Sequence, residues 1–226
     1  MMTMFGKLLG GLGVMILGAA PVLPAMAEEL SVAPVVQEGN GLVLNGLGHV
    51  FELPLPDWLS PAERLGGDVL GRVNASYRAD AKQGLLEIYP SGQTQEQWTT
   101  LFGARITLDA GRPLTDYRRA VMYGYSQTCK PELTGFFNFG QDNEQDLPVL
   151  AFVCGAYLDS IKGYAGLGEV MIVSFSKTDK ATAIAYQEWK GAAFDPSEPA
   201  TWPVGTETLK ARAEQLKAET ALTQAD

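Results

Sequence analysis

Apolar residues in the second half of the chain occur in short runs of the length that strands have. Four such runs, rich in β-branched and aromatic residues, are Thr134–Phe139, Val149–Tyr157, Glu169–Ser176 and Ala181–Trp189. Only Lys177–Lys180 separates the last two runs. Because so short a link cannot make a parallel crossover, the pattern predicts antiparallel pairing.

Earlier apolar runs predict two more strand pairs. Gly41–Leu44 and His49–Leu53 flank Asn45-Gly46, a dipeptide suited to the positive φ angles of a tight hairpin turn. Prolines follow the second run directly and end it, since proline cannot donate to a sheet ladder. Val69–Tyr77 and Leu85–Tyr89 form the other predicted pair.

Two internal segments carry helix signals. Thr94-Gln95-Glu96-Gln97 matches a capping box, which makes it the clearest helix start in the sequence. Trp98, Leu101 and Phe102 follow at positions i, i+3 and i+4 and would form one buried face of a short helix. A second helix is predicted from Thr115 to about Gln127, because apolar residues recur there at helical spacing.

The end of the chain favours a helix by composition, but only Leu209, Ala213 and Leu216 give it an apolar stripe. We therefore expect this tail to dock weakly or to fray. The predicted organisation is a signal peptide at 1–27, a flexible leader at 28–40, a single α+β domain at 41–204 and a helical tail at 205–226. The expected fold class is α+β, with an antiparallel β-sheet covered by helices and one disulfide.

The signal peptide is predicted from three features of the first 27 residues. Lys7 supplies a basic start, Leu8–Ala20 is an apolar, Gly-rich core, and Ala25-Met26-Ala27 fits a small-residue cleavage site. Prolines after the apolar core interrupt the helix where a membrane anchor would continue, and no cysteine is present there to carry a lipid. We expect cleavage after Ala27 and a soluble, periplasmic product.

The composition excludes several classes of protein. The 226 residues are 46% hydrophobic and 19% charged, which supports a globular core rather than a disordered chain. The 26 acidic residues outnumber the 17 basic ones and give a formal charge of −9. A chain with this excess of acidic residues lacks the basic patch that binds the phosphate backbone of a nucleic acid. We therefore expect no nucleic-acid partner. After residue 27, no apolar run approaches the roughly 20 residues of a membrane span.

The two cysteines, Cys129 and Cys154, are predicted to form a structural disulfide. An exported chain matures in an oxidising compartment, where an even pair of thiols normally ends as a disulfide. The spacing of the pair matches neither the C-x-x-C motif of redox catalysts nor a zinc pattern. The chain-entropy model assigns such a bridge roughly 3.5 kcal/mol of stability.

Several motifs resemble functional sites but lack residues that those sites need. Gly124–Thr128 lacks the final glycine of a nucleophile elbow, and the only histidine, His49, is expected to be a strand residue beside a turn. Asp142–Asp146 lacks the glycine and the bidentate acid that an EF-hand loop needs, so we expect a solvated acidic loop. We therefore assign no catalytic, cofactor-binding or metal-binding residue and expect no cofactor.

Two carboxylates and one tryptophan leave functional alternatives open. Glu87 and Glu169 are the best candidates for the paired acids of a hydrolase, although each is expected mainly to be an edge or pairing residue of a strand. Most aromatic residues have the spacing of core residues. Trp58 is the exception, because it lies in a proline-bounded loop, and it is the candidate for a binding surface.

One block of residues resembles a known pattern. Glu87-Ile-Tyr-Pro-Ser-Gly-Gln-Thr94, followed by Trp98-Thr99, resembles a block found in small exported proteobacterial proteins of uncharacterised function. Further elements of that pattern have counterparts in Cys129, Cys154, Gly168–Ile172 and Ala185–Trp189. The likeness spans about half of the chain, and the longer segment at 141–146 departs from it. The resemblance implies an antiparallel sheet covered by helices, similar to the PsbP-like α/β/α sandwich, and implies no catalytic residues.

The sequence thus favours a non-enzymatic binding or accessory module that acts on a protein or another component of the cell envelope. The alternative is an exported hydrolase whose carboxylates converge only in the fold. A concave cleft that holds two or more buried carboxylates would favour the hydrolase. A filled core with only an apolar surface patch would favour the binding module.

Overall fold

The computed structural model describes residues 28–29, 33–143 and 146–225, and these form two antiparallel sheets with three α-helices. The large sheet has eight strands in the order β1-β5-β6-β7-β11-β10-β9-β8. Its strands, in this order, are Glu28–Glu29, Val73–Ala79, Gln83–Pro90, Thr100–Thr107, Thr182–Ala192, Leu167–Lys177, Val149–Cys154 and Thr134–Phe139. The predicted signal peptide lies outside the described residues.

The small sheet has four strands in the order β12-β4-β3-β2. These strands are Ala221–Gln224, His49–Pro54, Gly41–Gly46 and Val35–Glu38. The helices are α1 (Pro61–Leu65), α2 (Leu114–Ser126) and α3 (Thr206–Glu219), and three short 3-10 turns are Leu70–Arg72, Pro131–Leu133 and Pro199–Thr201. Among the described residues, no helix is both long and apolar enough to cross a bilayer.

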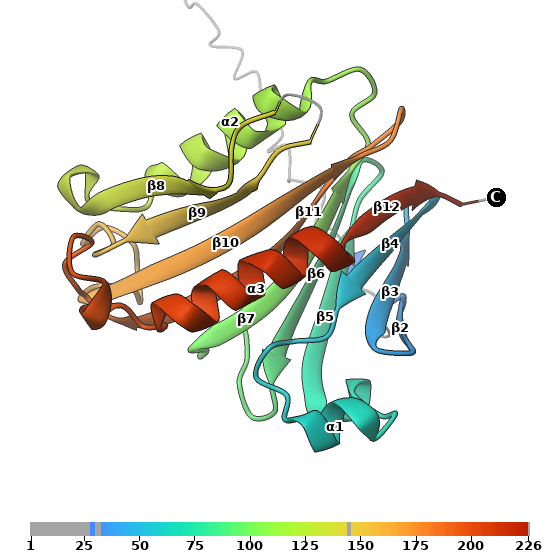
Figure 1. Ribbon diagram of the computed structural model, residues 1–226, viewed down its shortest axis with the longest axis horizontal. Helices are drawn as coiled ribbons and strands as arrows, with labels where there is room; N and C mark the ends of the chain where they lie inside the picture. The colour runs from blue at the N-terminus through green and yellow to red at the C-terminus, as the bar shows by residue number, and fades with distance from the viewer. Residues whose placement is uncertain (1–27, 30–32, 144–145, 226) are drawn as a thin grey trace, which may run out of the picture.

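The two faces of the large sheet pack against different partners. Helix α3 and the small sheet lie on one face, whereas α2 lies on the other, over the end of the sheet formed by β8, β9 and β10 (Figure 1). Alternating residues of one strand therefore enter different cores: Phe102 of β7 packs with α3, and its neighbour Leu101 packs on the α2 side. The antiparallel sheet covered by helices confirms the expected α+β fold class.

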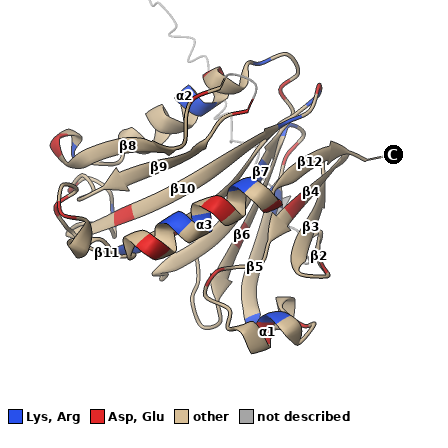
Figure 2. Ribbon diagram, in the orientation of Figure 1, with Lys and Arg blue, Asp and Glu red and all other residues tan. Residues whose placement is uncertain are grey.

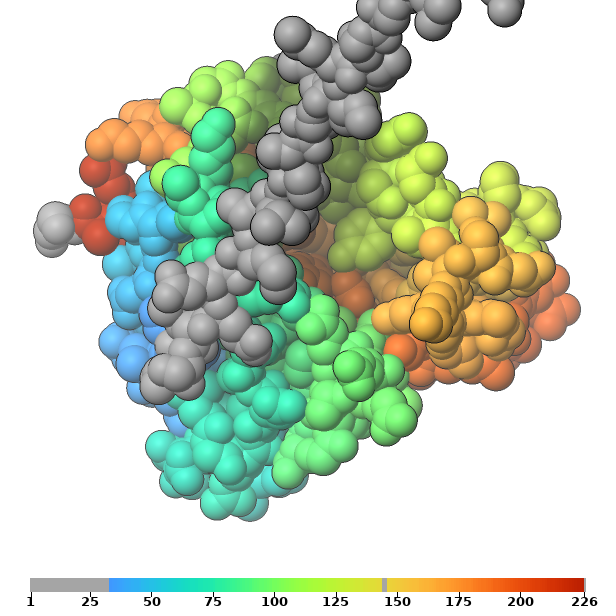
Figure 3. Space-filling view, turned by 180° about the vertical axis from the view of Figure 1, so that it is seen from behind, coloured from blue at the N-terminus to red at the C-terminus, as the bar shows by residue number. Residues whose placement is uncertain are grey.

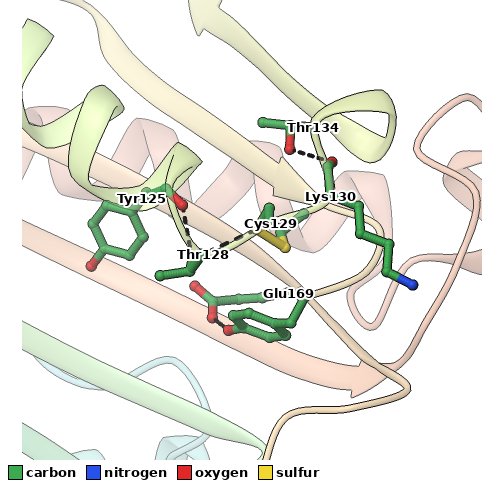
Figure 4. Close-up of a disulfide and its surroundings, with 8 residues drawn as sticks. Tyr125, Thr128, Cys129, Lys130, Thr134 and Glu169 are labelled. Carbon is green, nitrogen blue, oxygen red and sulfur yellow. Dashed lines mark hydrogen bonds between the residues drawn. A yellow bond between two sulfur atoms is a disulfide. The ribbon is translucent and has the colours of Figure 1, made fainter. Parts of the chain in front are cut away.

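The predicted disulfide is present. Cys129, which follows α2, is bonded to Cys154 at the end of β9, and the two Cα atoms are 5.7 Å apart. Both cysteines are buried. The bridge therefore fixes the end of α2 to the sheet (Figure 4).

The predicted helix at Thr94–Gln97 is wrong. Thr94 and Gln97 instead close a turn through backbone hydrogen bonds of 3.0 and 3.1 Å, and the residues from Thr100 onward form β7. Strand β7 pairs with β6 on one side and β11 on the other. A central strand with both faces covered carries apolar residues at successive positions, and Leu101 and Phe102 imitate helical spacing for that reason.

The first hairpin turns two residues later than predicted. Gly46 pairs with His49, so that Leu47 and Gly48 form the turn, with φ angles of 54° and 70°. Asn45 and Gly46 belong to β3 instead. A Cβ atom on Gly46 would lie 2.8 Å from the Tyr77 hydroxyl, which explains why glycine occupies this strand position.

Both ends of the described chain are more ordered than predicted. Val35–Glu38, in the expected flexible leader, forms strand β2 and pairs with β3. Leu209, Ala213 and Leu216 of α3 are buried in the main core, and β12 adds an edge strand to the small sheet. The expectation of a weakly docked tail is therefore wrong, because the thin apolar stripe of α3 is fully used.

Candidate functional site

A cleft of about 280 Å³ opens on the α2 face of the large sheet. Helix α2 packs chiefly on β9 and β10, and the cleft lies beside it over β6, β7 and β11. Figure 3 shows the hollow, with orange atoms at its floor between the green segment that leads into β7 and the yellow-orange loop before β10. Its lining residues are Leu85, Glu87, Tyr89, Gln95, Trp98, Leu101, Arg105, Tyr125, Tyr164, Ile184, Tyr186 and Glu188.

Charged residues within the large sheet are unusual in this protein. Figure 2 shows that most charges lie on helices and loops, and few lie on the strands. Glu87, Arg105, Glu169, Glu188 and Lys190 are exceptions, and all five belong to β6, β7, β10 or β11. Because a charged group in a sheet core loses hydration, a cluster of this kind indicates a site rather than a packing choice.

Glu188 lies at the centre of this cluster. Its side chain lines the cleft although the residue is only 6% exposed, and its Oε1 atom accepts a 2.9 Å hydrogen bond from the Tyr125 hydroxyl of α2. Burial raises the pKa of Glu188 to about 7, aided by the negative charge of Glu87 and opposed by the Tyr125 hydrogen bond. Near neutral pH, this carboxyl group can therefore both release and accept a proton.

Glu87, one of the two acids singled out from the sequence, lines the same cleft from β6. Its Oε2 atom lies 2.7 Å from Nη2 of Arg78 on β5, and this Arg78 side chain also donates a 2.9 Å hydrogen bond to Gln95. Arg78 thus places a positive charge directly beside the Glu87 carboxylate. The cleft thus contains one paired carboxylate and one carboxyl group that titrates near neutrality.

Glu169, the other acid singled out from the sequence, is buried on β10 next to Lys190 of β11 in the sheet register. One of its oxygens accepts a hydrogen bond from the Tyr157 hydroxyl, and its Oε1 atom has no partner among the described residues. Burial, and then the charge of Glu188, raise the pKa of Glu169 well above its ordinary value. Figure 4 shows Glu169 close to the disulfide, with Tyr125 reaching down from α2.

Tyr186 fills the floor of the cleft between β11 and β6. It is paired with Gly103 of β7, and a Cβ atom at Gly103 would lie 2.3 Å from Tyr186 Cζ, so the phenol ring passes directly over this glycine. Gly103 is in turn paired with Glu87. The phenol therefore extends from β11 towards the Glu87 carboxylate. Burial raises the pKa of Tyr186 well above its ordinary value, and the charge of Glu188 adds to this shift.

Two basic side chains complete the site. Arg105 of β7 donates a 3.2 Å hydrogen bond from Nε to the Tyr117 hydroxyl. The ammonium of Lys190 lies 3.9 Å from the ring centroid of Trp98 and 4.6 Å from that of Tyr164. Lys190 thereby links the segment before β7 to the loop before β10 through two cation–π contacts.

The structure places Trp58, the candidate for a binding surface, away from this cleft. Its half-buried ring packs against the core that contains α3, and its indole N–H is buried without a hydrogen-bond partner among the described residues. His49 is a buried strand residue beside a turn, and its Nε2 atom lies 3.1 Å from the Thr178 hydroxyl. Within the described part of the chain, no three His, Cys, Asp or Glu side chains are grouped to hold a metal ion.

Sequence reasoning identified Glu87 and Glu169 but missed Glu188. A usable signal was present, because Ile184, Tyr186 and Glu188 alternate along β11 and so share one face. A carboxylate on the buried face of an apolar strand indicates a functional site. The residues of α2 and of the two loops that enclose the site could be placed only by the fold.

Comparisons with known proteins add no functional information about this cleft: no protein-family model, no curated protein and no solved structure matches the chain.

Proposed function

We propose that the protein is an exported binding module of the cell envelope that takes a small ligand into the cleft beside α2. The observation that carries this proposal is the convergence of Glu87, Glu188 and several aromatic rings on one cavity of about 280 Å³. The disulfide supports maturation in an oxidising compartment, and with the N-terminal pattern of residues it supports periplasmic export.

A matched pair of variants tests this proposal. Gln95 is an exposed residue that lines the cleft, and Gln97 is an exposed residue of the same turn that does not line it. Gln95→Trp should fill the mouth of the cleft, whereas Gln97→Trp adds the same ring outside it. Thermal unfolding of each purified variant is measured with sugars, amino acids, polyamines and nucleosides.

At least one of these classes should raise the melting temperature of the native protein and of Gln97→Trp, but not that of Gln95→Trp. A ligand at 100 times its dissociation constant stabilises the folded state by about 2.7 kcal/mol. In a domain of this size, that corresponds to a shift of roughly 5–10 °C. If no class stabilises the native protein, or if Gln95→Trp responds like the native protein, the cleft is not a ligand site.

Hydrolysis is the second candidate function, and the pair of carboxyl groups favours it. The cleft meets the condition for a hydrolase, two buried carboxylates in one cleft, only in part: Glu188 and Glu87 face one cavity, but only Glu188 is buried, and Glu87 is half-buried and paired with Arg78. In this reaction Glu188 would donate its proton to the leaving group, and Glu87 would either activate the attacking water as a base or attack as a nucleophile.

Product analysis separates the two functions. A compound that stabilises the protein is incubated with it and then recovered, with Glu188→Gln as the comparison. Recovery of the intact compound supports binding alone. Cleavage by the native protein that falls by about 100-fold or more in Glu188→Gln supports the hydrolase.

A further inference from the structure

The polar groups that line the cleft are mostly planar groups with two or more hydrogen-bonding atoms, which we call forks. They belong to Glu87, Glu188, Gln95 and Arg105. The protein holds one atom of each carboxylate and of the amide: Arg78 bonds to Glu87 and Gln95, and Tyr125 donates to Glu188. The Nε atom of Arg105 likewise donates a hydrogen bond to the Tyr117 hydroxyl. A fork that the protein holds through one atom is fixed in orientation and can bind a ligand hydroxyl through another atom. Several forks around one cavity therefore fit a ligand with several hydroxyl groups.

The charges around the cleft offset one another. Glu87 is paired with Arg78, and the environment of Glu188 combines the attraction of Lys190 with the repulsion of Glu87. Arg105 adds a further positive charge to the wall. A cationic or an anionic ligand would therefore meet a charge of its own sign inside the cleft. This balance favours a neutral ligand.

Apolar surface lies next to these forks. The rings of Tyr89, Trp98 and Tyr164 line the cleft together with Leu101 and Ile184. Aromatic and aliphatic groups of this kind pack against the C–H groups of a sugar ring. The ammonium of Lys190 lies over the rings of Trp98 and Tyr164.

The size of the cavity limits the ligand. Its volume of about 280 Å³ lies just below the range of roughly 300–1,000 Å³ that is usual for drug-sized ligands. One or two sugar rings fit this volume better than a long chain does. From the forks, the balanced charge, the aromatic walls and the size, we infer that the cleft binds a neutral polyhydroxylated ligand of the mono- or disaccharide class. This inference rests on the proposed binding function.

Calorimetric titration tests the ligand class. The neutral probes are maltose, cellobiose and N,N′-diacetylchitobiose, and the charged probes are spermidine and citrate. At least one neutral probe should bind the native protein and Gln97→Trp, and its dissociation constant should rise about tenfold or more in Gln95→Trp. Because both replaced residues are exposed, near-UV circular dichroism should show that each variant is folded.

The same chemistry could come from a free sugar or from the end of a glycan polymer. Sedimentation with insoluble cellulose or chitin distinguishes these sources. A protein that binds the ends of the polymer is pelleted with it and so is removed from solution. Binding of the disaccharides without sedimentation assigns a free sugar. Either result supports the inference, whereas binding of none of the three disaccharides and neither polymer overturns it.

Failure of the ligand class can be told apart from failure of the proposed function. If spermidine or citrate binds in a manner that Gln95→Trp abolishes, while no sugar does, the cleft is a ligand site for an ion and the inference of a neutral sugar is wrong. If no compound of any class stabilises or binds the native protein, the binding function itself is wrong.

Discussion

The ring of Tyr186 lies over the backbone of Gly103, its partner in the register between β11 and β7. No other residue at position 103 would leave room for the ring, since a Cβ atom there would lie 2.3 Å from Tyr186 Cζ. The glycine thus permits a large phenol to cross a central strand and form the floor of the cleft. The shape of the proposed binding site depends on this one contact.

Gly103→Ala should therefore destabilise the protein and deform the cleft. Overpacking of a core position typically costs about 1–3 kcal/mol, and Tyr186 must move or the strands must separate. Urea unfolding followed by tryptophan fluorescence measures the loss. The matched control is Gly124→Ala in α2, where a Cβ atom would meet nothing within 4 Å.

Gly124→Ala should be neutral or should stabilise the protein by up to about 1 kcal/mol, because alanine is the better helix former. A double variant separates a steric clash from a loss of backbone freedom. Because Tyr186→Leu removes the ring, it should restore part of the stability that Gly103→Ala removes if the clash is the cause. Equal effects of Gly103→Ala and Gly124→Ala would show that the ring does not cross Gly103.

The fold confirms most of the strands that the pattern predicts, and its departures have physical causes. Thr134–Phe139 is β8 as predicted, and α2 covers nearly the predicted residues. The Thr94 segment fails because local capping signals are outweighed by the pairing of β7 with two neighbours. A short apolar run gives no sign of whether one or both of its faces are buried.

The candidate site is predictable only in part for a similar reason. Glu87 and Glu169 stand out as acids in or beside apolar strands, but their relation to Glu188 depends on the strand order β6-β7-β11-β10. Tyr125 reaches Glu188 across 63 positions of sequence. Contacts of this range are set by tertiary packing, which neither propensity nor periodicity encodes.

The stability of the protein should fall between pH 5 and pH 8. The folded state raises the pKa of Glu188 from 4.5 to about 7, so folded Glu188 holds a proton that the unfolded chain releases. The contribution of Glu188 to the free energy of unfolding is fully present below pH 4.5 and is lost as the pH rises through 7, by up to about 3 kcal/mol. Urea unfolding at several pH values measures this slope.

Glu188→Gln should flatten the pH profile, since the amide does not titrate but can still accept the Tyr125 hydrogen bond. Glu169 shifts in the same direction and should account for the remaining slope. A native protein that is equally stable at pH 5 and pH 8 would contradict the burial of these acids. So would a Glu188→Gln variant with the native slope.

The disulfide should contribute a substantial share of the stability. Replacing both Cys129 and Cys154 by alanine should cost roughly 3.5 kcal/mol, the loop-closure value for a sequence separation of 25 residues. Urea unfolding of the variant and of the reduced native protein measures the loss. A change below about 0.5 kcal/mol in both samples would show that the bridge constrains little.

Helix α3 should be essential to the fold. Leu216 is fully buried in the main core, and Leu216→Ala should cost about 2–5 kcal/mol. Glu214→Ala, on the exposed side of the same helix, should change the free energy of unfolding by no more than about 0.5 kcal/mol. If the two variants unfold at the same urea concentration, α3 is not part of the core.

The most direct test of the site is the titration of its glutamates by ¹³C NMR, with Glu188→Gln used to assign the resonance. A carboxyl group enclosed beside Tyr125 and Glu87 should titrate with a midpoint of about 7. A midpoint for Glu188 near 4.5, the ordinary value for a solvated glutamate, would contradict the enclosed, proton-holding cleft on which the proposed function depends.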